Sequence, residues 1–383
     1  MDSHHLYLHV PFCRLVCAYC DFVTVGGRQT DIPRYTEALA RELSAAPAPG
    51  SLQTIYFGGG TPSLLPTAAV ARLVQSAVDR WDATPAEVTL EANPSSRETP
   101  DWAGLRAAGV NRLSLGIQSL RDPELRALAR GQTAAEGLAA YAAARAAGFD
   151  NVSIDLIYGI PGQSLADWRS GLQAAIDLSP DHLSLYGLSL ALVPDEWAAP
   201  PRPGALRWRH RQVVQQDDDL AADQYALAED MLLAAGYHHY ELSSWARPGR
   251  ESQHNSAYWA RRPYTGLGAG AHSYDGAARR WWNERDLDAY LAAVEADARP
   301  VAGDEELDEP TRAFEAIALG LRRVDGLERS IFFAEFGEDL VERYRSATAT
   351  GLDGGLLEIT PEVVRLTERG RLLANDALVL FAP

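Results

Sequence analysis

The stretch His9-Val-Pro-Phe-Cys-Arg-Leu-Val-Cys-Ala-Tyr-Cys-Asp-Phe22 contains every cysteine of this 383-residue chain, namely Cys13, Cys17 and Cys20. Three residues separate the first two cysteines, and two residues separate the second from the third. Three thiolates in one short segment can bind three of the four irons of a [4Fe–4S] cluster and leave the fourth iron open to a small molecule. An open iron indicates a reactive centre rather than a purely structural one.

Other uses of clustered cysteines have to be compared with this one. Disulfides need an even number of cysteines, so three cannot all pair within one chain. A structural zinc ion usually has four protein ligands, and His9 would have to be the fourth. Cysteines that act as small buried hydrophobic residues would be scattered rather than gathered in one segment. We therefore favour the iron–sulfur cluster and keep the zinc site as the alternative.

The Cys-x3-Cys-x2-Cys spacing, with Tyr19 before the last cysteine, resembles the radical S-adenosylmethionine (SAM) superfamily. The flanking residues resemble the oxygen-independent coproporphyrinogen III oxidase-like group, also called HemN-like. Within that group the chain is more similar to the haem chaperones of the HemW type, because the oxidases carry a further cysteine where this chain has Asp21 and Phe22. The resemblance covers essentially the whole chain. It implies a [4Fe–4S] cluster, SAM and haem as bound groups.

Runs of β-branched and aromatic residues alternate with alanine-rich stretches along the chain, which is typical of repeated βα units. The expected strands are residues 4–10, 54–57, 87–92, 112–118, 151–158 and 182–188. Six parallel strands with intervening helices predict an α/β fold with a partial or full barrel, and the resemblance implies a partial, TIM-like (β/α)6 barrel. The chemistry of such a barrel lies at the C-terminal ends of its strands.

Distinctive residues follow these expected strand ends. Gly58-Gly59-Gly60-Thr61 comes after the second strand, and its glycines allow the backbone to approach a ligand closely. It resembles the superfamily motif that holds the amino group of SAM. The resemblance implies further SAM contacts from Tyr7, Glu91, Gln118, Arg130 and Asp155. For each residue taken alone, a buried ion pair inside a barrel is an equally good interpretation.

The later segment His254-Asn-Ser-Ala-Tyr258-Trp259 has an H-N-x-x-Y-W arrangement. It resembles the segment associated with haem binding in HemW proteins. A neutral imidazole binds haem iron, and aromatic rings pack on a porphyrin. We therefore predict His254 as the iron ligand, with Tyr258 and Trp259 against the porphyrin and Arg261 or Arg262 near a propionate. For His272 we favour a hydrogen-bonded role in a packed loop.

Two later segments interrupt the βα alternation. Residues 192–219 are rich in proline, differ from the usual HemW pattern, and predict no ordered helix before about Asp219. The acidic residues 302–310 predict a solvated linker. Beyond them, the pattern resembles the small C-terminal α+β, winged-helix-like domain of HemN-like proteins. We expect a barrel with a HemW-type extension over residues 1–300 and a C-terminal domain over residues 301–383.

Composition restricts the function classes. The chain has no apolar run near the roughly 18 residues of a membrane span, and its first expected strand begins too early to follow a signal peptide, so we expect a cytoplasmic protein. A net charge of −17 argues against nucleic-acid binding. All 35 basic residues are arginine, which excludes chemistry that needs a lysine amine.

These features predict a haem chaperone of the HemW type, a non-catalytic or weakly SAM-cleaving carrier that transfers haem to respiratory haem proteins. The expected partners are haem, the haem-acceptor proteins and, transiently, a membrane surface; a homodimer stays open. The alternative is a HemN-like radical SAM enzyme such as a class C methyltransferase. Coproporphyrinogen oxidation is disfavoured because no cysteine follows Cys20.

Overall fold

The computed structural model describes residues 3–95, 100–190, 203–213 and 215–382. Its main feature is a sheet of 12 strands in the order β14-β13-β12-β11-β1-β4-β5-β6-β7-β8-β10-β9. The six central strands run parallel to one another: β1 (Ser3–Val10), β4 (Ser51–Gly59), β5 (Glu87–Ala92), β6 (Arg112–Gln118), β7 (Val152–Tyr158) and β8 (His182–Gly187). All six expected strands are therefore confirmed.

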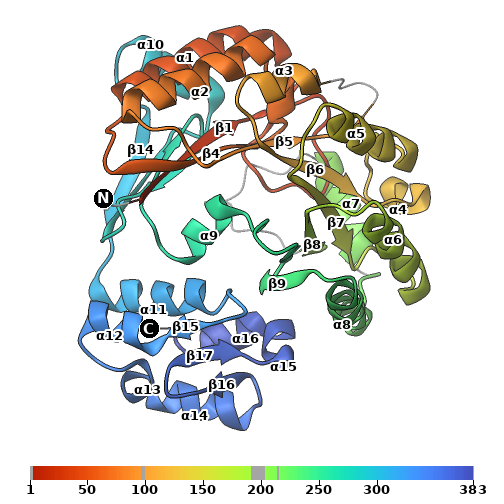
Figure 1. Ribbon diagram of the computed structural model, residues 1–383, viewed down its shortest axis with the longest axis vertical. Helices are drawn as coiled ribbons and strands as arrows, with labels where there is room; N and C mark the ends of the chain where they lie inside the picture. Colours follow the sequence, from red (N-terminus) through yellow and green to blue (C-terminus); the bar gives the residue numbers. More distant parts are fainter. Residues whose placement is uncertain (1–2, 96–99, 191–202, 214, 383) are drawn as a thin grey trace.

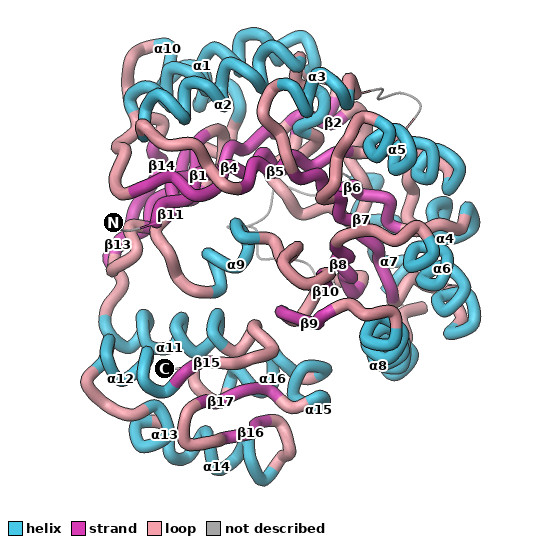
Figure 2. The backbone as a smooth tube through the Cα atoms, viewed as in Figure 1, coloured by secondary structure: helices cyan, strands magenta, loops and turns pink. Residues whose placement is uncertain are grey.

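The barrel is partial because β1 and β8 do not pair with each other. The outer neighbour of β1 is β11 (Tyr264–Leu267), and that of β8 is β10 (Ser244–Ala246), which continues to β9 (His238–Glu241). Helices cover the convex face of the curved sheet (Figures 1 and 2). They are α1 (Ile32–Ala45), α2 (Thr67–Trp81), α3 (Trp102–Ala107), α4 (Asp122–Ala127), α5 (Ala134–Ala146), α6 (Leu165–Asp177) and α8 (Asp218–Ala234). The central strands are almost continuously buried, as expected for parallel strands covered on both faces.

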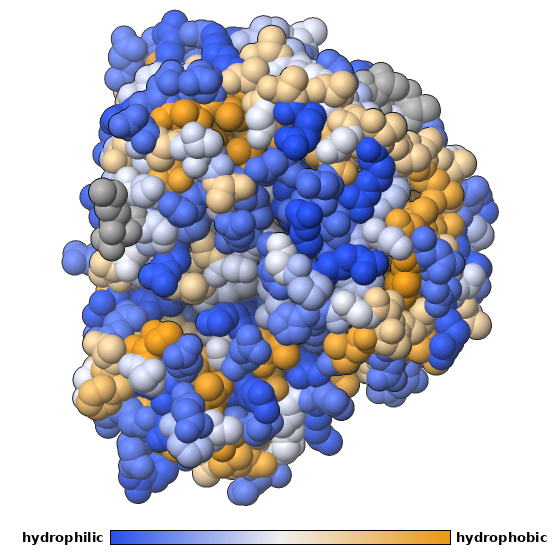
Figure 3. Space-filling view, in the orientation of Figure 1, coloured by the Kyte–Doolittle hydropathy of each residue, from blue (hydrophilic) through white to orange (hydrophobic). Residues whose placement is uncertain are grey.

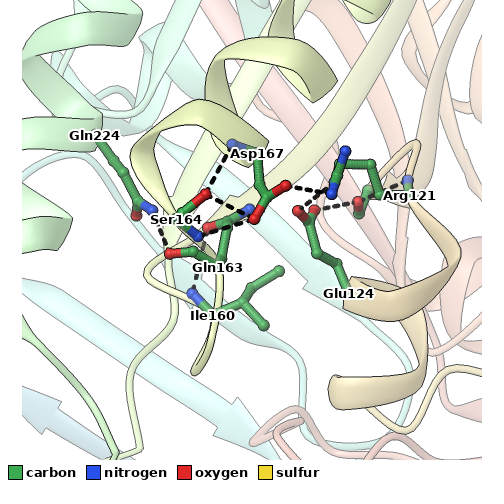
Figure 4. Close-up of polar contacts among 8 residues, drawn as sticks. Arg121, Glu124, Ile160, Gln163, Ser164, Asp167 and Gln224 are labelled. Atoms are coloured by element: carbon green, nitrogen blue, oxygen red, sulfur yellow. Dashed lines mark hydrogen bonds and ion pairs between the residues drawn. The ribbon is translucent and has the colours of Figure 1, made fainter.

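Polar contacts hold the outer helices to the loops that follow β6 and β7 (Figure 4). Arg121, just before α4, bonds Glu124 at 3.0 Å and also pairs with Asp167 in α6. Ser164 and Asp167 form a reciprocal capping box at the start of α6. Gln224 of α8 donates to the carbonyl oxygen of Gln163 at 3.3 Å. The backbone at these strand ends is thus fixed from outside the barrel.

The acidic segment that we expected to be a solvated linker is an edge strand, so that prediction was wrong. β14 (Val301–Glu306) pairs antiparallel with β13 (Arg279–Asn283), and its residues alternate between partly buried and exposed positions. Arg279 lies opposite Glu306 and Arg280 opposite Glu305. Arg280 pairs with Glu305, and Arg279 bonds the diagonal neighbour Asp304 at 2.9 Å. Cross-strand charge pairing explains why an acidic sequence forms a strand here.

The prediction of no helix before about Asp219 was also wrong. Residues Pro203–Val213 form α7. A proline does not prevent a helix from starting, because the first-turn N–H groups have no partner within the helix. The helix is anchored by tertiary contacts: Trp208 Nε1 donates to the carbonyl oxygen of Ala127 at 3.1 Å, and Arg209 Nε donates to that of Ala18 at 3.1 Å.

The remaining elements near the barrel are short. β2 (Phe12–Cys13) pairs with β3 (Val25–Gly26), and two 3₁₀ turns lie at Gln29–Asp31 and Pro62–Leu64. α9 (Gln253–Trp259) lies on the concave side of the sheet, whereas β12 (His272–Tyr274) and β13 extend the sheet beyond β11, and α10 (Leu287–Glu295) packs beside α1 (Figure 1). No helix in the described residues is both long enough and apolar enough to cross a membrane.

The C-terminal part has its own core and a three-stranded sheet, β15-β17-β16. Its core includes Ile317, Phe332 and Val364. Its elements are α11 (Glu309–Gly320), β15 (Leu327–Glu328), α12 (Arg329–Phe336), α13 (Leu340–Arg343), α14 (Arg345–Asp353), β16 (Leu357–Ile359), β17 (Val363–Leu366), α15 (Glu368–Leu372) and α16 (Ala374–Val379). Small hydrophobic patches lie between hydrophilic areas on its visible surface (Figure 3). This arrangement confirms the expected α+β character.

Candidate functional site

A cavity of about 460 Å³ lies at the C-terminal ends of the central strands. This is the end of a parallel barrel at which ligands bind, and the volume lies in the usual range for small-molecule sites. The residues predicted from the sequence that line it are Cys13, Cys17, Cys20, Gly59, Gly60, Thr61, Glu91, Gln118, Arg130 and Asp155. One cavity therefore collects the three cysteines and most of the residues assigned to SAM.

The cysteine loop crosses one side of this cavity. Thr61 Oγ1 donates to Cys13 Sγ at 3.6 Å, and Arg130 Nη1 donates to Cys17 Sγ at 3.1 Å. Burial raises the pKa of the Cys20 thiol to about 11, so a nearby cation such as iron would be needed to hold it as a thiolate. Hydrogen bonds to cluster-ligating sulfurs are a usual means of tuning iron–sulfur centres.

The alternative zinc site does not fit this geometry. His9, the candidate fourth ligand, has Nε2 2.7 Å from the carbonyl oxygen of Val23 and Nδ1 3.0 Å from the hydroxyl of Tyr7. In the described residues, no three His, Cys, Asp or Glu side chains converge closely enough to hold a single metal ion. A [4Fe–4S] cluster has a weaker requirement, because each thiolate binds a different iron. The residues present therefore fit the cluster better than a mononuclear metal.

The glycine-rich loop supports the cysteine loop directly. Gly59 has a φ of 112°, a region that disfavours residues with a side chain. A Cβ atom on Gly60 would lie 2.7 Å from the carbonyl oxygen of Phe12 and 2.8 Å from that of Pro11. Gly60 N and Thr61 N also donate to backbone oxygens of residues 10 and 12, both at 2.8 Å. Gly58 lies behind the cavity, under the rings of Tyr7 and Tyr56.

We expect Gly60→Ala to disturb the cysteine loop. The new methyl group would meet backbone atoms rather than a flexible side chain, so the segment before Cys13 would have to move, at a cost of roughly 1–3 kcal/mol. Reduced iron content after anaerobic reconstitution and a lower melting temperature would report this change. Gly171→Ala in α6 is the matched control, because its Cβ would have only an ordinary contact, 3.6 Å from Arg121. Equal iron content in both variants would contradict the expectation.

Carboxylates make the floor of the cavity acidic. Glu91 accepts hydrogen bonds from the Tyr56 hydroxyl at 2.8 Å and from Gly59 N at 3.1 Å, and burial raises its pKa to about 7. Asp155 accepts from the hydroxyl of Ser114 at 3.0 Å, and burial raises its pKa as well. Two carboxylates that are costly to ionise when alone would be stabilised by a cationic ligand. SAM, with its sulfonium and ammonium groups, has that character.

Two of the predicted SAM contacts depend on unusual backbone. Gln118 has a φ of 68° at the end of β6, next to a register shift between β6 and β7. Arg130 follows Ala129, whose φ is 54°. Left-handed conformations at residues other than glycine are uncommon and tend to occur at functional sites. Here they direct Gln118 and Arg130 into the wall of one cavity.

Tyr7 lies outside this cavity. It lines a second cavity of about 270 Å³, together with His9, Phe22, Tyr258, His272 and others. Asp21 and Phe22 line both cavities, so the two adjoin across the end of the cysteine loop. We predicted Tyr7 as a SAM contact, but its hydroxyl bonds His9 Nδ1 at 3.0 Å.

The structure places His254 in the protein core. Its Nδ1 lies 2.7 Å from Thr54 Oγ1 and its Nε2 2.9 Å from the Tyr258 hydroxyl, and its side chain is 1% exposed. Two backbone N–H groups at the start of α9 donate to Glu87, which holds this helix against the barrel. Both ring nitrogens of His254 are thus hydrogen bonded, and binding to an iron would require one of these two bonds to open. His254 as the haem ligand stays a prediction.

The other predicted haem contacts separate from one another. Tyr258 lines the second cavity, but Trp259 packs under Arg322, whose guanidinium carbon is 4.3 Å from the ring centre. Arg261 bonds Glu335 of α12 at 2.8 Å and so attaches α9 to the C-terminal part. Of the H-N-x-x-Y-W residues, Tyr258 lines a cavity, and the haem-binding role of the segment stays a prediction.

Two further cavity residues were not predicted from the sequence. Asn93 and Tyr186 also line the first cavity, after β5 and at the end of β8. Both follow the rule that selected the others, because each lies at the C-terminal end of a central strand. For the sixth strand we had selected no residue, although Tyr186 is 45% exposed there.

Comparisons with known proteins agree with this architecture. The Radical SAM superfamily profile matches residues 7–173, and the HemN C-terminal domain profile matches residues 307–373. The E. coli coproporphyrinogen III oxidase HemN, described as a radical SAM enzyme, superposes with a TM-score of 0.83 over 99% of this chain and 90% of its own. At 23% sequence identity, this match establishes the fold alone.

Curated relatives resemble this chain along nearly its whole length. A protein named heme chaperone HemW from Mycobacterium tuberculosis (strain CDC 1551 / Oshkosh) is 40% identical, covering 98% of this chain and 93% of its own. The protein of that name from Escherichia coli (strain K12) is 33% identical, covering 98% and 97%. The chain belongs to the HemW family of the radical SAM superfamily.

Proposed function

We propose that this protein is a haem carrier, which binds haem and transfers it to respiratory haem proteins. The observation that carries the proposal is the full-length similarity to proteins named heme chaperone HemW, at 40% identity in the M. tuberculosis relative. Asp21 and Phe22 agree with it, since they occupy the place of the further cysteine expected in the oxidases.

In this proposal Cys13, Cys17 and Cys20 hold a [4Fe–4S] cluster, and SAM occupies the adjoining space of the first cavity. When bound, the cluster and SAM supply one-electron chemistry at the sulfonium group. The polypeptide positions the ligand: Gly59 to Thr61 offer backbone groups, Glu91 and Asp155 offer carboxylates, and Gln118 and Arg130 offer side-chain donors.

The partners belong to the same proposal. We infer a cytoplasmic protein that meets haem-acceptor proteins and, transiently, the membrane surface that contains them. The net charge of −17 supports a role without nucleic acid. Light scattering of the reconstituted protein would show whether the chain forms a homodimer.

An anaerobic titration of the reconstituted protein with haemin, followed by an assay for SAM cleavage, tests the function. We expect one haem per chain and little 5′-deoxyadenosine without an acceptor protein. Rapid SAM cleavage without haem binding would favour the alternative, a HemN-like enzyme such as a class C methyltransferase.

SAM binding should depend on the ionisation of Glu91. Burial raises the pKa of Glu91 from 4.5 to about 7. The hydrogen bond from the Tyr56 hydroxyl lowers this pKa in part, whereas the charge of Asp155 raises it further. The folded protein therefore holds this proton more tightly than the unfolded chain does. The contribution of Glu91 to the free energy of unfolding falls as pH rises from about 4.5 to about 7. A cationic ligand reverses this preference, so SAM affinity should rise as pH increases through about 7.

Calorimetric SAM titrations of the parent protein and Glu91→Gln at pH 6 and pH 8 measure this effect. We expect the parent to bind SAM several-fold more tightly at pH 8 than at pH 6. Glu91→Gln, which cannot ionise, should lose that pH dependence. The same pH dependence in both proteins would mean that another group, such as Asp155, controls SAM binding.

A further inference from the structure

α7 packs against the turn that carries Cys17 and Cys20. The N–H of Cys20 donates to the carbonyl oxygen of Cys17 at 3.2 Å and closes this turn. Trp208 of α7 belongs to a small apolar core, against which Ala18 and Tyr19 of the turn pack. The helix comes from the proline-rich segment, for which the sequence suggested no role. Its position indicates that this segment supports the cysteine loop.

Arg209 of α7 holds both sides of Cys20. Its Nε donates to the carbonyl oxygen of Ala18 at 3.1 Å, and its Nη2 donates to the carboxylate of Asp21. Ala18 lies within the turn, and Asp21 follows Cys20 directly. One planar guanidinium group therefore bonds two points of the loop. Two bonds from one rigid fork restrict the loop more than a single flexible donor would.

The ion pair between Arg209 and Asp21 is partly buried. The Arg209 side chain is 3% exposed and that of Asp21 is 35% exposed. Removing charges from water costs free energy, and the attraction within the pair often does no more than offset this cost. A buried ion pair is therefore weak evidence for a gain in stability. Its place directly after Cys20 indicates a role at the cluster instead.

The charges of this pair lie beside the cluster ligands. Asp21 lines the first cavity together with all three cysteines. A [4Fe–4S] core with three thiolates carries a net negative charge, which becomes more negative when the cluster is reduced. An uncompensated carboxylate nearby would repel the added electron, whereas the Arg209 guanidinium compensates this carboxylate. The local charge is one of the factors that set the reduction potential of a cluster.

We propose that Arg209 is a positioning residue of the iron–sulfur cluster, which fixes the turn between Cys17 and Cys20 and compensates the charge of Asp21. The inference rests on the cluster ligation in the proposed function and extends it to a helix from a distant part of the chain. Asp21 lines both cavities, so the same ion pair also fixes part of the wall between them.

Shifts of the reduction potential in opposite directions test the electrostatic role of Arg209. The potential of the reconstituted full-length protein is measured by redox titration, with the electron paramagnetic resonance signal of the reduced cluster as the readout. Arg209→Gln leaves the carboxylate uncompensated, so we expect a more negative potential. Asp21→Asn leaves the guanidinium uncompensated, so we expect a more positive potential. The variant with both changes should lie close to the parent.

Arg211→Gln is the matched control, because Arg211 is exposed on the same helix and lines neither cavity. Its potential should equal that of the parent. A pair that only braced the loop would change the potential in the same direction in both single variants, because each variant removes the same bond. Shifts of the same sign, or no shift in either variant, would overturn the electrostatic role. If Arg209→Gln takes up no cluster, Asp21→Asn decides, and a potential no higher than the parent's overturns that role.

The rate of iron loss to a chelator tests whether Arg209 fixes the turn. Arg209→Gln should lose iron roughly tenfold faster than the parent, the factor expected when a charge-assisted hydrogen bond is lost. Arg209→Lys keeps the positive charge but has no planar fork to bond both partners. We therefore expect it to combine a potential close to the parent's with faster iron loss. Iron loss at the parent's rate in both variants would show that Arg209 does not hold the turn.

A failure of the proposed cluster ligation has a different result. A parent protein that takes up no [4Fe–4S] cluster under these conditions would contradict ligation by the three cysteines, and with it the proposed function. A parent protein that carries the cluster, with a potential and a rate of iron loss that none of these variants changes, would contradict the role of Arg209 alone.

Discussion

Cys17→Ala should leave the protein almost free of iron after anaerobic reconstitution. The substitution removes one of the three thiolates that hold a [4Fe–4S] cluster, and the chain has no other cysteine to replace it. His9 cannot substitute easily, because both its ring nitrogens are hydrogen bonded. We expect iron to fall from about four atoms per chain to below about one, with loss of the broad cluster absorbance. Cys13→Ala and Cys20→Ala should behave alike.

Leu15→Ala provides the control within the same loop. Leu15 is 51% exposed and cannot bind iron, so its removal tests whether any change in the loop is enough to lose the cluster. Parent-like iron and absorbance in this variant, with loss in the cysteine variants, would support direct ligation. A full complement of four irons in Cys17→Ala would exclude Cys17 as a ligand.

The barrel was predictable from sequence because its strands carry a strong local signal. Parallel strands covered on both faces are nearly continuous apolar runs, and polar residues directly after them mark the ligand-binding end. Glu91, Gln118 and Asp155 follow three neighbouring strands and line one cavity. Their convergence depends only on strand order and on the shared direction of the strands.

The features that were mispredicted depend on partners far away in the chain. α7 is anchored by Trp208 and Arg209 through contacts with residues 127 and 18, and β14 is a strand because Arg279 and Arg280 lie opposite its carboxylates. Local proline and charge content cannot report such partners.

The hydrogen bonds of the candidate histidines also depend on residues far away in the chain. The H-N-x-x-Y-W pattern made His254 conspicuous, but Thr54, 200 residues earlier, takes one of its ring nitrogens. His272 looked like an ordinary loop residue, although its ring faces a cavity. Whether an imidazole has a free nitrogen is a property of packing, and the motif alone carries no information about it.

Arg130→Gln should weaken SAM binding and also change the cluster. The guanidinium lines the first cavity, where Nη1 donates to Cys17 Sγ at 3.1 Å. Nη2 is held by Asn93 at 2.6 Å and by the carbonyl oxygen of Gly116 at 2.7 Å. These bonds fix one face of the group and leave its positive charge beside the ligand space. A carboxylate of SAM would find a charge-assisted donor there, worth roughly 1.5–3 kcal/mol, or about ten- to 150-fold in affinity.

The change in the cluster distinguishes a ligand-binding role of Arg130 from a purely structural one. Removing a positive charge and a donor from the Cys17 sulfur destabilises the more negative, reduced cluster, so the reduction potential should become more negative. Arg126→Gln makes the same charge change at an exposed position in α4, outside the cavity, and should alter neither quantity. If Arg130→Gln only lowers the melting temperature, with SAM affinity and potential unchanged, the guanidinium braces the loop and contacts no ligand. Weaker SAM binding together with a shifted potential would place Arg130 between the cluster and SAM, because no purely structural contact would move both.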